Sequence, residues 1–175
     1  TETYEKVPTG NDAYRLAAEY ARKAINASGC QIMDESTWLG TGFNLQNNSW
    51  MWGMVQSSDT VLNNLLSWAA HMSLEAVYGY GYGAQPGIQV ASYDRLSNTD
   101  FRKRVFVGPD RKYSKYSDLT SLTEEEFETI APYASFKFHT NGREKTNYTT
   151  ANVVDIPLMR VEEMYFIEAE ATAHY

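Results

Sequence analysis

Glycine alternates with tyrosine in the middle of the chain, and this run is the most distinctive candidate for binding chemistry. The segment Tyr78–Gly87 reads Tyr-Gly-Tyr-Gly-Tyr-Gly-Ala-Gln-Pro-Gly. A Gly-x-Gly-x-Gly pattern can cradle a phosphate, but a phosphate loop follows a strand and opens a helix, whereas Pro86 and Gly87 prolong this loop. Alternating glycines can instead let tyrosines present ring faces and hydroxyl groups to a sugar. We therefore predict that Tyr80 and Tyr82 stack on a sugar. The alternative is a packed aromatic loop without a ligand.

Upstream aromatic and amide residues form a second set of candidates. Trp50 and Trp52 alternate among Gly, Asn and Ser residues, so a short strand would place both indoles on one side. Tryptophan is large and highly buried on average, which favours core anchors over a sugar platform. For a sugar site, Trp38 and Trp50 are second candidates for stacking, and Asn47 or Asn48 is the candidate amide that binds sugar hydroxyls.

Two carboxylates could support hydrolysis. Asp94 and Asp100 lie in a charge-rich stretch, and glycosidases use two such groups, one as acid and the other as base or nucleophile. The neighbouring Arg and Lys side chains would keep both acids ionised rather than raise a pKa. Structural ion pairs are the favoured interpretation, and a hydrolase that uses Asp94 and Asp100 remains an alternative.

Histidine and cysteine give no metal or nucleophile pattern. His71, His139 and His174 are isolated, without a pair at metal-ligand spacing. Cys30 is the single cysteine, which excludes an internal disulfide and a cysteine-based metal cage. We expect His71 to be a packing residue and Cys30 an ordinary half-buried one. The sequence predicts no catalytic residue, metal or cofactor.

Composition indicates a globular chain. It has 175 residues, 43% of them hydrophobic, which suffices for a core. A net charge of −7 argues against a nucleic-acid partner, which needs clustered Lys and Arg. There is no apolar run of about 18 residues that could span a bilayer. Because the chain begins without Met and stops inside a helical pattern, we expect a fragment.

Two segments at the ends carry the clearest helical periodicity. In Asn11–Ser28 apolar residues recur at helical spacing, with Asn11 or Asp12 as the expected cap and Gly29 as the end. Its alanine-rich face suits close helix packing, as in tetratricopeptide repeats, although no period of about 34 residues recurs.

The last segment, Asp155–Tyr175, begins with Asp155 as the expected cap and Pro157 in the first turn. We expect Arg160 and Glu163 to form an ion pair on one face. The expected apolar stripe is Leu158, Val161, Tyr165, Ala169 and Thr172.

The middle of the chain predicts shorter elements. Ser57–Val77 has helical spacing, and Thr123–Glu126 is a capping box at the start of a short helix. Tyr133–Thr140 alternates as a strand, and Asn141-Gly142 predicts a hairpin turn. The tyrosine-bearing run after Gly108, as far as Ser117, is expected to be an exposed loop.

Three stretches are more specific than their periodicity. The first is Asp155-x-Pro157-Leu-x-Arg160-x-x-Glu163-x-Tyr165-x-x-x-Ala169-Glu170-Ala171. The second is Tyr93-Asp94-Arg95-Leu-Ser-x-Thr-Asp100-Phe-Arg102-Lys103-Arg104, and the third is Tyr133-Ala-Ser-Phe-Lys137-Phe. Together they resemble the SusD/RagB family of outer-membrane lipoproteins, which bind nutrients, usually glycans, at the surface of Gram-negative bacteria. The resemblance spans residues 93–171, and a weaker likeness reaches back to about residue 11.

The resemblance implies a mainly α fold: a tetratricopeptide-like helical scaffold with a loop-rich aromatic region and a few short strands. Residues 1–175 would form a single partial SusD-like domain. In it, 11–28 and 155–175 are scaffold helices and 31–153 is a loop-rich region that faces the ligand.

The implied function is surface capture of an oligosaccharide, polysaccharide or other nutrient polymer, and its delivery to a SusC-like TonB-dependent transporter. The implied location is the outer membrane, as a cell-surface lipoprotein whose lipid anchor lies outside this fragment. The alternatives are the hydrolase described above and a helical protein-docking domain without a sugar site. The identity of the glycan, and whether the ligand is a peptide, stay open.

Overall fold

The computed structural model describes residues 9–40, 43, 45–57, 68–76, 79–138 and 154–174. The chain divides into two compact units. One comprises Thr1–Met33, Asn48–Trp52 and Leu158–Tyr175, and the other comprises Asp34–Asn47 and Gly53–Pro157. The structure is mostly helical with a few short strands, which confirms the predicted fold class.

Helix α1 spans Asn11–Ser28, as the sequence predicts. Gly29 ends it in the left-handed conformation at φ 66°, which glycine adopts without steric cost. The predicted cap at Asn11 or Asp12 is wrong. The carbonyl of Gly10 already accepts the first helical hydrogen bonds, so both residues lie inside the first turn. The buried face of the helix comprises Ala18, Ala21 and Ile25.

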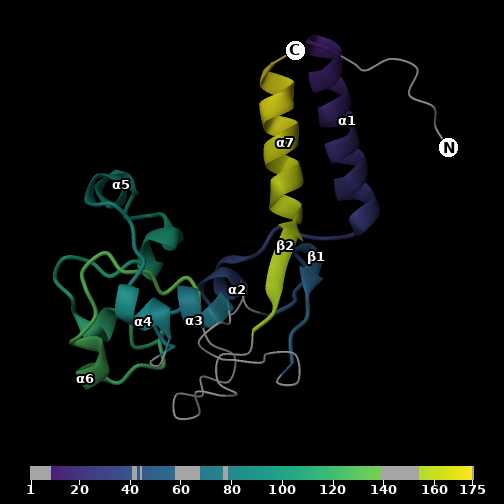
Figure 1. Cartoon of the computed structure of the whole chain (residues 1–175). Coiled ribbons are helices and arrows are strands. Elements are labelled where there is room, and N and C mark those ends of the chain that lie inside the picture. Colours follow the sequence, from purple (N-terminus) through teal and green to yellow (C-terminus); the bar gives the residue numbers. More distant parts are fainter. Residues whose placement is uncertain are drawn as a thin grey trace. The chain divides into compact units, whose positions relative to one another are not determined.

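Helix α7 (Val161–Ala173) lies antiparallel beside α1 (Figure 1). The Arg22 guanidinium donates to both carboxylate oxygens of Glu168, at 2.8 and 2.6 Å. At the other end of the pair, the rings of Tyr14 and His174 stack with their centroids 4.4 Å apart. Small buried residues such as Ala171 let the two backbones approach closely.

The final helix begins later than predicted. Residues Ile156–Arg160 form strand β2, which pairs with β1 (Trp50–Met54) in a two-stranded sheet. Each strand of such a sheet has one unpaired edge, so Pro157 is tolerated without a backbone donor. Helix α7 starts only at Val161, whose N–H donates to the carbonyl of Ser49.

Asp155 is not a helix cap. Its buried carboxylate accepts the backbone N–H of Gln46 at 3.2 Å and that of Gln56 at 2.9 Å. These two bonds join chain segments about a hundred residues apart in sequence, which a local capping pattern cannot indicate. The carboxylate therefore fixes the chain on both sides of β1.

The expected side-chain pattern of the last helix also needs correction. Arg160 pairs with Glu162 at 3.4 Å instead of Glu163. Leu158 lies exposed on β2, and Ala169 and Thr172 are exposed on α7, so the predicted apolar stripe is not the buried face.

The larger unit is built from short helices around an aromatic core. They are α2 (Glu35–Leu39), α3 (Trp68–Met72), α4 (Tyr80–Ala84), α5 (Val90–Arg95), α6 (Glu124–Phe127), and the 3-10 helices η2 (Phe101–Val105) and η3 (Tyr113–Lys115). In its core, the Phe127 ring stacks on Tyr116 at 5.4 Å and on Phe136 at 5.9 Å. Helix α6 has the predicted capping box, in which Thr123 and Glu126 each accept the other's backbone N–H.

Two predicted elements of this unit differ from the structure. Within the described residues, the predicted 57–77 helix is represented by α3, and the chain turns at Leu74. The predicted 133–140 strand is reduced to isolated bridges, Gly87 with Ala134 and Phe106 with Ser135. Its end and the Asn141-Gly142 turn lie outside the described residues.

Tyr116, predicted to lie in an exposed loop, is buried. Its hydroxyl accepts the N–H of Gly108 at 2.6 Å and donates to the carbonyl of Phe106 at 3.3 Å. The buried Tyr116 hydroxyl therefore stabilises the turn at Gly108 through these two hydrogen bonds.

Candidate functional site

The glycine–tyrosine run forms a helix rather than the predicted open loop. Helix α4 begins after Gly79 and ends at Gln85, which takes the left-handed conformation. Positions 80 and 82 lie about 200° apart around a helix, so Tyr80 and Tyr82 face opposite sides. They therefore cannot form one stacking surface, as the predicted loop would have allowed.

These two tyrosines differ in their exposure. Tyr80 is 60% exposed, and its ring stacks on that of His71 from α3, with centroids 5.1 Å apart and planes inclined by 29°. Tyr82 is half-buried against the aromatic core, and its hydroxyl shares a 2.8 Å hydrogen bond with the hydroxyl of Thr129. His71 was expected to be a packing residue, and its ring packs against that of Tyr80.

The second-choice aromatic candidates are more enclosed. Trp38 is half-buried and meets Phe43 and Phe101 edge to face, at 5.3 and 5.5 Å. Trp50 is buried at 8% exposure, as a core anchor should be. Trp52 is 63% exposed, so the core role favoured for it is wrong.

The amide candidates lie near the start of β1. Asn47 is half-buried, and its side-chain amide donates to the carbonyl of Leu45 at 3.1 Å. Asn48 is exposed, and its backbone carbonyl accepts the N–H of Gln31. Asn48 and Trp50 belong to the unit that contains α1 and α7, which we call the helical-hairpin unit. The other four candidates belong to the larger unit.

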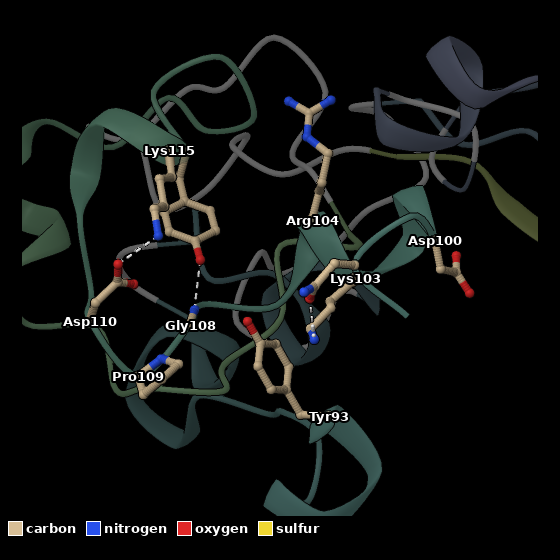
Figure 2. A pocket seen from close by; sticks show the side chains of 10 residues that line it. Tyr93, Asp100, Lys103, Arg104, Gly108, Pro109, Asp110 and Lys115 are labelled. Carbon is tan, nitrogen blue, oxygen red and sulfur yellow. Dashed lines mark hydrogen bonds and ion pairs between the residues drawn. The ribbon is translucent and has the colours of Figure 1, made fainter. Parts of the chain in front are cut away.

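A cavity of about 570 Å³ opens in the larger unit, and no predicted sugar-stacking or amide candidate lines it (Figure 2). It mixes aromatic, cationic and acidic side chains around a turn. The lining residues are Tyr93, Asn98, Asp100, Lys103, Arg104, Gly108, Pro109, Asp110, Lys115 and Tyr116. The charge-rich stretch and the Gly-Pro-Asp turn are both visible in the sequence, but only the fold brings them together.

Asp100 forms an ion pair with Arg102. It caps η2 by accepting the backbone N–H of Arg102, and its carboxylate binds that residue's guanidinium at 2.6 Å. The Arg102 hydrogen bonds hold the pKa of Asp100 below its ordinary value. Asp94 is exposed on α5. The structural ion pair favoured for Asp100 is therefore confirmed.

Metal and membrane features give no further site in the part of the chain that the structure describes. No group of three or more His, Cys, Asp or Glu residues gathers there as a possible metal site. No helix among the described residues is long and apolar enough to cross a bilayer. Cys30 is half-buried, as expected, with its thiol 3.6 Å from the Trp50 carbonyl oxygen.

Comparison with known proteins yields a structural match. No family model and no curated protein matches the sequence. A solved structure described as a SusD-like carbohydrate binding protein from Bacteroides vulgatus ATCC 8482 is similar to 99% of this chain, with a TM-score of 0.57 and 20% sequence identity. The chain spans 36% of that protein's length. The resemblance to SusD-like proteins is thereby confirmed for the fold.

Proposed function

We propose that this chain is part of a SusD-like protein that captures a glycan at the cell surface and delivers it to a SusC-like TonB-dependent transporter. The observation that carries the proposal is the structural similarity, along 99% of the chain, to a carbohydrate binding protein. The three signature-like stretches support it independently, because they are features of the sequence alone. The outer-membrane location, through a lipid anchor beyond this chain, belongs to the same proposal.

The exposed ring of Tyr80 is the best placed of the predicted stacking residues. His71 supports one side of it, while the ring remains 60% open to solvent. A fixed aromatic surface suits sugar binding because little side-chain freedom is lost when the ligand stacks. One stack contributes on the order of 1 kcal/mol, so polar groups around it must supply the remaining affinity.

Capture requires no catalytic group, and the geometry of the acids agrees with that role. A glycosidase needs one protonated carboxyl group as its acid. Arg102 stabilises the ionised form of Asp100 and lowers its pKa, which is the wrong direction for an acid at neutral pH. Binding therefore fits the site better than the hydrolase alternative. A docking domain without a sugar site would leave the exposed Tyr80 surface without a ligand.

The proposal is tested by incubating the full chain with a panel of polysaccharides and measuring retention and released reducing sugar in the same tubes. Retention on at least one glycan without release supports capture. Release of reducing sugar would instead favour a hydrolase, and the variants Asp94→Asn and Asp100→Asn would then identify its acid. Absence of retention on every glycan would contradict sugar capture and favour the docking domain.

A further inference from the structure

We propose that the cavity beside Tyr93 is a second sugar site, which binds an anionic sugar unit carrying a carboxylate or sulfate group. The sugar part of this inference rests on the proposed function, and the anionic part rests on the cavity itself. Lys103 would supply the positive charge, and Tyr93 a hydroxyl donor. No predicted stacking residue lines this cavity, so it is distinct from the Tyr80 surface.

The Lys103 ammonium is held in place by uncharged groups. It donates to the carbonyl of Leu96 at 3.0 Å and to the side-chain oxygen of Asn98 at 2.9 Å, and it lies 4.6 Å from the centre of the Tyr93 ring. An ammonium group has three N–H donors, so one remains for a ligand. Within the described ranges, no carboxylate lies at ion-pair distance from Lys103.

The other charged side chains that line the cavity are already paired. These pairs are Asp100 with Arg102 at 2.6 Å, Arg104 with Asp118 at 2.8 Å and Lys115 with Asp110 at 2.5 Å. Figure 2 shows the Lys115 side chain directed at Asp110 and the Asp100 carboxylate at the edge of the site. Each acidic side chain that lines the cavity is therefore paired with a cation. Among the described lining residues, Lys103 is the cation that has no carboxylate partner and can bind an anionic ligand.

The Tyr93 hydroxyl offers a second donor. Among the described residues it makes no hydrogen bond, and a β-carbon added at Gly108 would lie 3.1 Å from it. The pKa of Tyr93 is raised, first by burial and then by the neighbouring Tyr116 and Asp110, so the phenol keeps its proton at neutral pH. A free ammonium N–H and a free phenol O–H can bind an acidic group together with an adjacent sugar hydroxyl.

The size of the cavity agrees with such a ligand. Sites for small ligands typically measure about 300 to 1,000 Å³, and this cavity of about 570 Å³ lies within that range. The chain as a whole carries a net charge of −7, which repels polyanions over long distances. An acidic glycan would therefore be bound through a short-range contact with a local cation, as Lys103 provides.

The test compares Lys103→Gln with Lys112→Gln in the full chain. Gln keeps an N–H donor at this position but removes the charge, whereas Lys112 is exposed and does not line the cavity. The probes are polygalacturonate for carboxylate, chondroitin sulfate for sulfate, and neutral galactan. We expect Lys103→Gln to weaken binding of at least one acidic probe about tenfold, as for one lost charge-assisted hydrogen bond. Lys112→Gln should leave it unchanged.

Raising the salt concentration distinguishes the local contact of the ligand with Lys103 from the long-range repulsion between the ligand and the negatively charged chain. The ratio of the dissociation constants of Lys103→Gln and the unmodified chain should shrink as NaCl rises from about 50 to about 500 mM. Equal binding of acidic probes by both lysine variants would overturn this inference. Binding of galactan but of neither acidic probe would also overturn this inference, but it would leave the proposed function intact. Binding of no glycan at all would overturn both.

A structural role for Lys103 would give a different result. If Lys103→Gln lowers the melting temperature, binding of galacturonate by the unmodified chain can be followed by NMR. Shifts of the Tyr93, Lys103 and Gly108 signals on titration are then expected. Saturating galacturonate and saturating sulfated galactose that both leave these signals in place would contradict the inference.

Discussion

The backbone of Gly81 lies directly against that of Ser73, so that a β-carbon at position 81 would be 2.5 Å from the Ser73 carbonyl oxygen. This contact joins α4 to the chain that leaves α3, and it holds Tyr80 and His71 in their stacked arrangement. The glycine is therefore required by close packing of two backbones, not by loop flexibility.

Replacement of Gly81 by Ala should lower the free energy of unfolding by about 1 to 3 kcal/mol, because neither backbone can move aside without breaking its own contacts. Gly83 is the matched control, since a β-carbon there meets nothing within 4 Å. Gly83→Ala should be neutral or stabilising by up to about 1 kcal/mol, because alanine favours the helix. Urea denaturation of both variants measures this. Equal effects of the two substitutions would contradict the packing argument.

Asp155→Ala should cost about 2 to 3 kcal/mol of stability, because two backbone N–H groups lose a buried charged acceptor. The exposed Asp94 is the control, and Asp94→Ala should change the stability by less than about 0.5 kcal/mol. Denaturant unfolding followed by tryptophan fluorescence distinguishes the two. A small effect at Asp155 would show that its two hydrogen bonds do not stabilise the fold.

The ion pair of Asp100 predicts an acid-sensitive contribution to stability. Because its pKa is lowered in the folded state, the contribution is present above the ordinary aspartate value of about 3.9 and is lost as pH falls through the lowered value. The difference in melting temperature between the unmodified chain and Asp100→Asn should therefore shrink as pH falls from about 5 to about 2. Arg102→Gln should show the same trend. A difference that stays constant over this range would rule out the ion pair as its source.

Tyr82 and Tyr80 should differ in their effect on folding. Tyr82→Ala should destabilise the protein by about 2 kcal/mol, because a half-buried ring and the hydrogen bond to Thr129 are lost. Tyr80→Ala removes an exposed ring and should cost less than about 1 kcal/mol. Thermal unfolding of both variants gives the comparison. A larger loss for Tyr80→Ala would show that its ring serves the fold rather than a ligand.

Local patterns in the sequence predicted much of the fold. The periodicity of Asn11–Ser28 and the left-handed cap at Gly29 gave the bounds of α1, and the capping box at Thr123 gave the start of α6. Each depends on residues within a few positions of one another. The charged residues of the stretch that contains Asp94 and Asp100 were likewise expected to form structural ion pairs, and Asp100 does so.

Contacts between distant segments were not predictable in this way. Asp155 and Pro157 have the local pattern of a helix start, but pairing of β2 with β1 and the bonds to Gln46 and Gln56 favour a strand. Tyr80 and Tyr82 looked equivalent in the sequence. The geometry of helix α4 directs Tyr80 to solvent and Tyr82 to the core.

The cavity beside Tyr93 depends on the same kind of information. Its lysine and its tyrosine come from η2 and α5, and its turn at Gly108 follows the isolated bridge between Phe106 and Ser135. No spacing rule relates these segments, although their charges were noted in the sequence. The site could therefore be recognised only after folding brought them together.

Sugar capture on the exposed face of Tyr80 is best tested by calorimetric titration of a retained glycan into the unmodified chain, Tyr80→Ala and Tyr14→Ala. Tyr14 is the matched control, because it also stacks on a histidine at the surface, in the helical-hairpin unit. Tyr80→Ala is expected to lower the affinity about five- to tenfold, as for the loss of one sugar–aromatic stack, without release of reducing sugar. Tyr14→Ala should bind like the unmodified chain. Equal affinity of all three proteins would contradict a sugar site at Tyr80.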